Sequence, residues 1–128
     1  MDILVLNGSP RQGGNTSTMV HAFKEGAVYK GHKVTIIDVC RKKIQGCLGC
    51  EHCHRRGHGE CIQKDEMQEV YRALETAEMI VIASPICYFG FSGQLQCAIH
   101  RTCAVGIPKN LRKAMLILSS GSNGVYEG

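Results

Sequence analysis

Four cysteines stand close together near the middle of the chain, in the pattern Cys47-x2-Cys50-x2-Cys53-x7-Cys61. Two-residue spacers let successive thiols turn toward a common centre, and thiolates ligate both iron-sulfur clusters and structural zinc. Three near-evenly spaced cysteines followed by a more distant one are more typical of iron-sulfur sites than of two separated zinc knuckles. Three histidines in the same stretch make a Cys3His zinc site an alternative: His52, His54 and His58. Free or redox-paired thiols are the third interpretation.

A second group of residues that could bind a ligand follows the first apolar run. Residues 7–17, NGSPRQGGNTS, lead into a segment with helical periodicity. Unpaired backbone N–H groups at a helix start and the positive end of its dipole favour a phosphate. Four side chains can add hydrogen bonds: Ser9, Asn15, Thr16 and Ser17. The segment is neither a Walker loop nor a Gly-x-Gly-x-x-Gly turn, so we predict a single-phosphate site rather than an ATP or classical NAD site. A plain turn capped by Asn15 or Thr16 is the alternative.

The elements that must position these residues follow from the apolar pattern. Four short apolar runs are continuous rather than alternating, as strands covered on both faces should be: 3–6, 34–39, 79–83 and 115–118. Segments between them carry apolar residues at helical spacing, such as Met19, Phe23 and Ala27. We therefore predict an α/β domain with a parallel sheet over 1–128. Residues 40–64 are the one long stretch without periodicity, and we expect them to form a cysteine-rich loop.

Composition limits the function classes. The chain has 128 residues, 44% of them hydrophobic, which suits one packed domain. Its 8 cysteines fall below the roughly 8–10% of disulfide scaffolds, and no signal peptide accompanies them, so we expect metal or redox chemistry in the cytoplasm. Outside the loop, Cys97 and Cys103 on one predicted helix are expected to be buried as small hydrophobic residues.

Charge and hydropathy bear on the partners. The net charge of +4 favours anionic partners, but aromatic residues make up only 5% of the chain, so nucleic-acid binding is not expected. No apolar run approaches the ~20 residues of a membrane-spanning helix, so a membrane is not an expected partner either.

Residues 7–17, after an N-terminal strand, resemble the phosphate loop of the NADPH-dependent FMN reductase group in the flavodoxin-like superfamily. Residues 84–95, SPICYFGFSGQL, resemble the loop of that family that lines the isoalloxazine, and residues 119–124 fall where it has a third flavin-side loop. The resemblance implies a doubly wound parallel sheet of order 2-1-3-4(-5), with FMN beyond strands 1 and 3. The FMN-binding residues that it implies are Ser9, Arg11, Asn15, Thr16, Ser17, Pro85, Ile86, Tyr88, Phe89, Gly90, Ser120 and Gly121.

The cysteine spacing and its place after the second strand resemble the iron-sulfur flavoproteins, in which such a loop binds a [4Fe-4S] cluster beside FMN. The resemblance implies four ligands: Cys47, Cys50, Cys53 and Cys61. It also implies an NAD(P)H-dependent FMN reductase-like oxidoreductase that passes electrons between cluster, FMN and an external donor such as NAD(P)H or ferredoxin. No side chain is assigned a catalytic role because the flavin carries the chemistry. Basic residues near the loop would steer an acidic electron-transfer protein.

The chain departs from the family pattern at several positions. Cys87 stands where the family commonly has an aromatic residue, Gln96 where it has Lys, and His100 where it has Asp. The family also continues past the fourth strand with a further βα unit, whereas this chain stops at Gly128. A noncatalytic, truncated flavodoxin-like module with a structural zinc site is therefore the alternative function. An uncharged edge strand at 115–118 leads us to expect a homo-oligomer.

Overall fold

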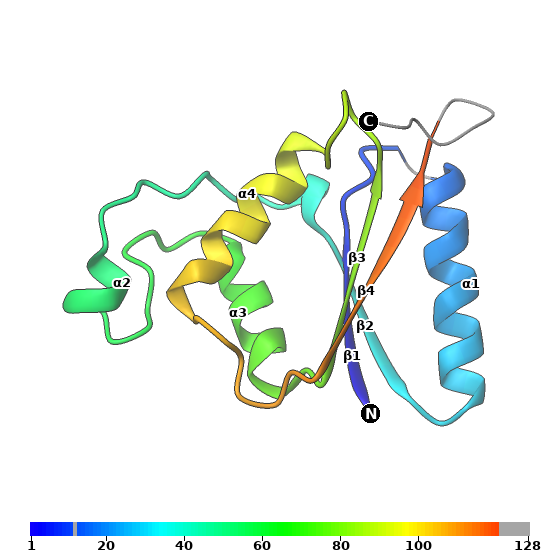
Figure 1. The fold of residues 1–128 in the computed structure, drawn as a ribbon, viewed down its shortest axis with the longest axis horizontal. Helices are drawn as coiled ribbons and strands as arrows, with labels where there is room; N and C mark the ends of the chain where they lie inside the picture. Colours follow the sequence, from blue (N-terminus) through cyan, green and yellow to red (C-terminus); the bar gives the residue numbers. More distant parts are fainter. Residues whose placement is uncertain (12, 121–128) are drawn as a thin grey trace.

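A computed structural model describes residues 1–11 and 13–120 (Figure 1). Its strands are β1 (Asp2–Asn7), β2 (Lys33–Asp38), β3 (Met79–Pro85) and β4 (Lys113–Ser119). Its α-helices are α1 (Asn15–Tyr29), α2 (His52–Arg55), α3 (Met67–Thr76) and α4 (Gly93–Arg101), with short 3-10 helices η1 (Val39–Arg41) and η2 (Thr102–Ala104). Each predicted strand is present within about two residues of its predicted bounds, and α1 spans the predicted helical positions Met19, Phe23 and Ala27.

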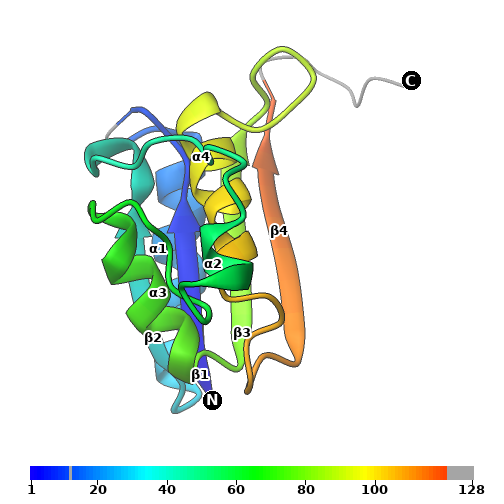
Figure 2. The same cartoon turned by 90° about the vertical axis from the view of Figure 1, so that its left-hand side faces the viewer.

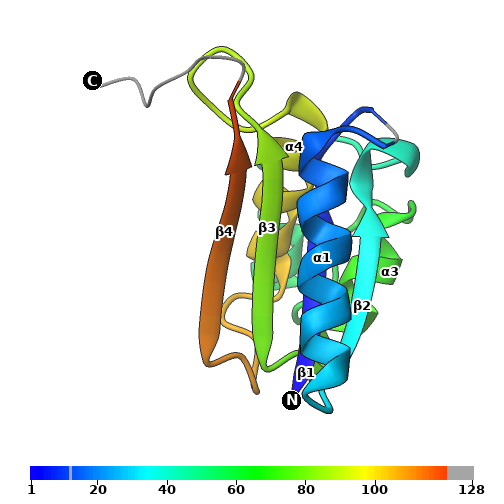
Figure 3. The same cartoon turned by 90° about the vertical axis from the view of Figure 1, so that its right-hand side faces the viewer.

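The strands form one parallel sheet in the order β2-β1-β3-β4. Helix α1 covers one face of the sheet, while α3 and α4 cover the other (Figures 2 and 3). This confirms the predicted flavodoxin-like arrangement, in which β1 and β3 lie side by side although α1, β2 and α3 separate them along the chain. Their carboxyl ends therefore meet at one edge of the sheet, where ligands bind in such folds.

The continuous apolar run of β1 has a direct structural reason. Leu4 and Leu6 pack with Met67 and Leu95 between the sheet and the layer of α3 and α4. Ile3 and Val5 point to the opposite face, where Val20 of α1 completes a second core cluster. Because successive side chains of a strand point to opposite faces, a strand buried on both sides is apolar at every position.

The sheet ends at β4, which pairs only with β3 among the described residues. Three of its apolar side chains are exposed: Met115, Leu116 and Leu118, the second by 57%. Figure 3 shows this strand at the outer edge of the sheet, beyond β3. No helix in the described ranges is long and apolar enough to cross a membrane.

Candidate cofactor cleft and metal centre

A cleft of about 360 Å3 lies where β1 and β3 end and α1 begins. Seven of the predicted flavin-site residues line it: Ser9, Arg11, Asn15, Thr16, Pro85, Ile86 and Ser120. Three residues outside that predicted set also line it, namely Pro10, Gly14 and Ser119, and so does Cys87. The parallel register pairs Ser119 with Pro85, and the Ile86 N–H donates to the Ser119 carbonyl at 2.8 Å. That register brings Ser119, the first residue of the third predicted flavin-side loop, to the wall of the cleft.

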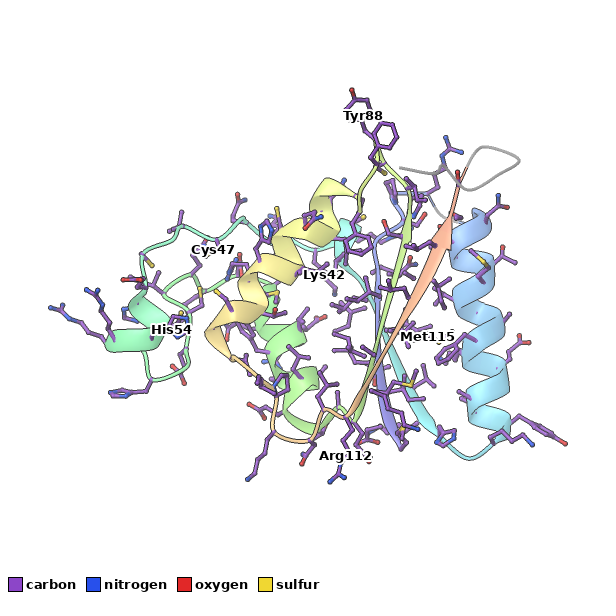
Figure 4. All side chains as sticks on the ribbon, viewed as in Figure 1. Lys42, Cys47, His54, Tyr88, Arg112 and Met115 are labelled. Carbon is purple, nitrogen blue, oxygen red and sulfur yellow. The ribbon has the colours of Figure 1, made fainter. Side chains whose placement is uncertain are left out.

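The other predicted flavin-site residues lie elsewhere. Ser17 is buried beneath the loop, where its hydroxyl lies 3.4 Å from the Arg11 carbonyl. Tyr88 and Phe89 project from the tip of the loop after β3 and are 96% and 78% exposed (Figure 4). Gly90 pairs with Cys87 in the narrow hairpin that carries them. Gly121 lies outside the described residues.

The start of α1 is open to an anion. Its N-cap is Gly14, with extended backbone, and no side chain in the described ranges caps the first turn. The first N–H groups of a helix lack intrahelical acceptors, so this start offers donors together with the positive end of the dipole. The N-cap is Gly14 rather than the predicted Asn15 or Thr16, both of which lie inside the helix. The Thr16 hydroxyl is 2.7 Å from that of Ser119.

Contacts with the sheet and with α4 hold the loop between β1 and α1 in place. The Asn7 side-chain amide donates to Asp38 at 2.9 Å, and its oxygen accepts the Ser9 N–H at 3.2 Å. At Gly8 a Cβ atom would lie 2.8 Å from both Cβ and Cδ2 of Leu95, so only glycine lets the loop lie this close to α4. The loop is thus fixed to both the sheet and a helix before any ligand binds.

A second pocket, of about 320 Å3, lies between the cysteine loop and the end of α4, on the side of the molecule where Figure 4 labels Cys47 and His54. The four predicted metal ligands line it: Cys47, Cys50, Cys53 and Cys61. A fifth cysteine, Cys103 of η2, lines it too. The expectation that Cys103 is buried among apolar residues is wrong, because its side chain is exposed and faces the loop. Cys103 was overlooked because it lies 42 residues after Cys61.

The two ends of the cysteine loop are held together by one buried ion pair. The Arg101 guanidinium, 1% exposed, donates to both carboxylate oxygens of Asp65 at 2.8 and 2.9 Å. The same group donates to the Gln45 carbonyl at 2.9 Å and to that of Gln63 at 3.4 Å. A bidentate arginine–carboxylate pair fixes direction as well as distance. Arg101 and Asp65, hereafter the neck clamp, therefore close the loop at its base.

Electrostatics support the charged form of the neck clamp. Burial opposes ionisation of Asp65, but hydrogen bonds from Arg101 and from the backbone N–H groups of Gln45 and Met67 outweigh it and lower its pKa. Those hydrogen bonds also explain why α3 does not start with Asp65 as its N-cap. Asp65 and Gln68 resemble a capping box, yet α3 begins at Met67 with Glu66 as its N-cap. The Asp65 carboxylate accepts hydrogen bonds both from the Gln45 N–H in the loop and from the Met67 N–H at the start of α3.

Tyr71 of α3 makes a hydrogen bond to the backbone of Arg101 at the end of α4. Its hydroxyl donates to the Arg101 carbonyl at 2.7 Å, and burial raises the pKa of Tyr71 to about 12. The phenol is therefore neutral at physiological pH and keeps the proton that it donates. Helix α4 starts after its N-cap Ser92, whose hydroxyl lies near Gly8, and η2 with Cys103 follows its end. The cleft and the cysteine pocket therefore lie toward opposite ends of α4.

Comparisons with known proteins agree with this architecture. The model of the NADPH-dependent FMN reductase family matches residues 1–126. An iron-sulfur flavoprotein of Archaeoglobus fulgidus is 34% identical over 121 residues, which are 94% of this chain and 52% of that protein. An iron-sulfur flavoprotein of Methanocaldococcus jannaschii is 36% identical over 113 residues, 86% of this chain and 54% of that protein. The chain spans about half the length of these curated relatives.

Solved structures show the same fold. The NAD(P)H:quinone oxidoreductase from Methanothermobacter marburgensis has a TM-score of 0.77 at 19% identity, covering 94% of this chain and 65% of that one. An FMN-dependent NADH-azoreductase from Bacillus anthracis, in complex with FMN, has a TM-score of 0.64 at 15% identity, covering 98% and 71%. With its doubly wound sheet, its family match and these neighbours, the chain belongs to the NADPH-dependent FMN reductase family.

Proposed function

We propose that the chain binds FMN in the cleft at the ends of β1 and β3 and acts as an electron-transfer oxidoreductase of the iron-sulfur flavoprotein type. A [4Fe-4S] cluster would occupy the cysteine pocket, and electrons would pass between cluster, FMN and an external donor such as NAD(P)H or ferredoxin. The observation that carries the proposal is the uncapped start of α1, which opens into a cleft at the switch point of the sheet.

The residues of the cleft fit FMN. Its phosphate suits the N–H groups at the start of α1, the Thr16 hydroxyl and the charge of Arg11. The apolar side chains of Pro85 and Ile86 form the opposite wall, where a flat ring would pack. When bound, FMN supplies the hydride and single-electron chemistry, while the protein orients it and selects what reaches it.

The cysteine pocket fits an iron-sulfur cluster by its donor set. Four loop thiols, Cys47, Cys50, Cys53 and Cys61, line one space, and four thiolates are the usual ligands of a [4Fe-4S] cluster. The neck clamp holds the loop ends together, so ligand binding need not first close a long loop. The relatives named iron-sulfur flavoproteins support the same assignment.

Partners follow from the surfaces near the two sites. NAD(P)H would dock over the ring at the open side of the cleft, beside the exposed Tyr88 and Phe89. An acidic electron-transfer protein would meet exposed Lys43 and Arg56 around the cysteine loop. The exposed apolar edge of β4 supports a homo-oligomer, since an unpaired strand edge invites pairing.

The flavin part of the proposal is tested by a matched pair of threonines on α1. Thr16 is buried in the cleft, whereas Thr18 is exposed and its hydroxyl donates to the Gly14 carbonyl at 3.0 Å. Thr16→Ala should weaken FMN binding by about tenfold or more, because a hydrogen bond to a charged oxygen is worth roughly 1.5–3 kcal/mol. Thr18→Ala should leave it unchanged. Fluorescence titration with FMN that finds equal affinities for the two variants would contradict the site.

A further inference from the structure

Three metal-ligating side chains meet at one point beside the cysteine loop. The ligand atoms of Cys53, His54 and Cys103 all lie within 4.8 Å of one another. Cys53 and His54 are neighbours on α2, while Cys103 comes from η2 at the end of α4. The group therefore joins the loop to the body of the domain. It is the one such group found among residues 1–11 and 13–120.

This spacing suits a single ion rather than a cluster. With metal–ligand bonds of about 2.0–2.3 Å, the ligand atoms of a tetrahedral zinc site lie roughly 3.5 Å apart, so small side-chain rotations would bring these three into range. In a [4Fe-4S] cluster each thiolate binds its own iron, and the cysteines need not converge on one point. Two thiolates and one imidazole are also a donor set that Zn2+ prefers.

The surroundings leave room for an ion and for a fourth ligand. All three side chains line the 320 Å3 pocket, with Cys53 half-buried and the other two exposed. The thiol of Cys47 lines the same pocket and interacts with the thiol of Cys103, so it is available as a further donor. Arg101 lies two residues before Cys103, so the neck clamp holds the η2 side of the group in place.

The geometry points to a second binding mode for this pocket: a mononuclear site for a thiophilic divalent ion such as Zn2+, with Cys53, His54 and Cys103 as ligands and Cys47 in the fourth position. Binding converts each thiol to a thiolate and releases one proton per cysteine, with no change of oxidation state. The site shares Cys53 and Cys47 with the proposed cluster, so the two modes exclude one another. Zinc binding does not depend on the cluster proposal, because Cys103 and His54 have no part in that ligand set.

The site is tested on the metal-free chain of residues 1–128, kept reduced and anaerobic, with Zn2+ in competition against a chromophoric chelator. Cys103→Ser and His54→Gln should lower Zn2+ affinity by roughly tenfold or more, since even residues that only orient ligands contribute about that much. Matched controls are Cys97→Ser, on α4 just before η2, and His58→Gln, on the same loop as His54, because neither residue lines the pocket. Both controls should bind Zn2+ like the unmodified chain.

A measurement on the unmodified chain tests the site without any substitution, so its result does not depend on how the variants fold. Zn2+ should protect Cys53 and Cys103 from alkylation, as read by mass spectrometry of peptides, and leave Cys97 reactive. Zinc binding unaffected by Cys103→Ser and His54→Gln, with Cys103 still alkylated, would overturn the inference and assign zinc to the loop cysteines alone. Iron reconstitution of the same variants is a separate readout. If Cys103→Ser retains iron but loses zinc, both proposals stand, and failure to retain iron in any form of the chain would count against the cluster alone.

Discussion

The flavin cleft and the cysteine pocket are built in opposite ways. The cleft uses the ends of buried strands and the start of a long helix, and its loop is held to the sheet by Asn7 with Asp38 and packs against α4 at Gly8. The cysteine pocket uses a long loop with little secondary structure, closed by one ion pair between residues 36 positions apart. A pocket in a long loop can thus be closed at its base by a single buried ion pair, without a sheet edge to position it.

The largest expected effect comes from breaking the neck clamp. Arg101→Met removes the guanidinium but leaves the Asp65 carboxylate, mostly buried, without its partner. Loss of one member of a buried pair should lower the free energy of unfolding by about 3 kcal/mol. The cysteine loop should also become sensitive to protease between 46 and 63, while the cleft should keep its FMN affinity. Urea unfolding, limited proteolysis and FMN titration measure the three quantities.

The matched control for this prediction is an arginine within the loop. Arg55 pairs with Glu51 at 2.9 Å, but both side chains are largely exposed. Arg55→Met should change the free energy of unfolding by less than about 1 kcal/mol, as is usual for surface ion pairs. Equal destabilisation by the two variants would mean that burial of the clamp has no special role.

The corresponding change in the cleft is at Gly8. Gly8→Ala places a Cβ atom 2.8 Å from the Cβ of Leu95, which can move only with its helix. We expect a loss of about 1–3 kcal/mol of stability from overpacking, together with weaker FMN binding. Gly26→Ala is the control, because a Cβ at that position meets nothing within 4 Å and should stabilise α1 by about 0.5–1 kcal/mol. If Gly8→Ala unfolds like the unmodified chain, the close approach to α4 is not required.

The contrast between the two sites also explains what sequence could predict. Continuous apolar runs identified every strand, and the phosphate loop identified the cleft, because both are signals carried by neighbouring residues. The neck clamp could not be predicted, because no local sequence pattern distinguishes Arg101 and Asp65 from charged residues on the surface. Cys103 was placed wrongly for the same reason: helical spacing indicates a face of a helix but not which loop packs on it. The contribution of Ser119 to the cleft depends on the register between β3 and β4.

A smaller effect concerns pH. Because the neck clamp lowers the pKa of Asp65 in the folded chain, ionised Asp65 stabilises the fold above its ordinary pKa of about 3.9, and this stability is lost as the pH falls through the lowered value. Asp65→Asn lacks this titration. The difference in free energy of unfolding between the two chains should therefore shrink from about pH 5 to about pH 3 in urea titrations. Parallel pH profiles would show that Asp65 gains nothing from the clamp.

The most direct test of two separate cofactor sites in one chain is a crossed measurement of FMN and iron. The unmodified chain, Thr16→Ala and Cys53→Ser would be purified without oxygen, reconstituted with iron and sulfide, and assayed for bound FMN, iron content and the electron paramagnetic resonance of the reduced cluster. We predict that Thr16→Ala loses FMN and keeps iron, while Cys53→Ser loses the cluster signal and keeps FMN. Loss of both cofactors in either variant, or retention of neither by the unmodified chain, would contradict two independent sites.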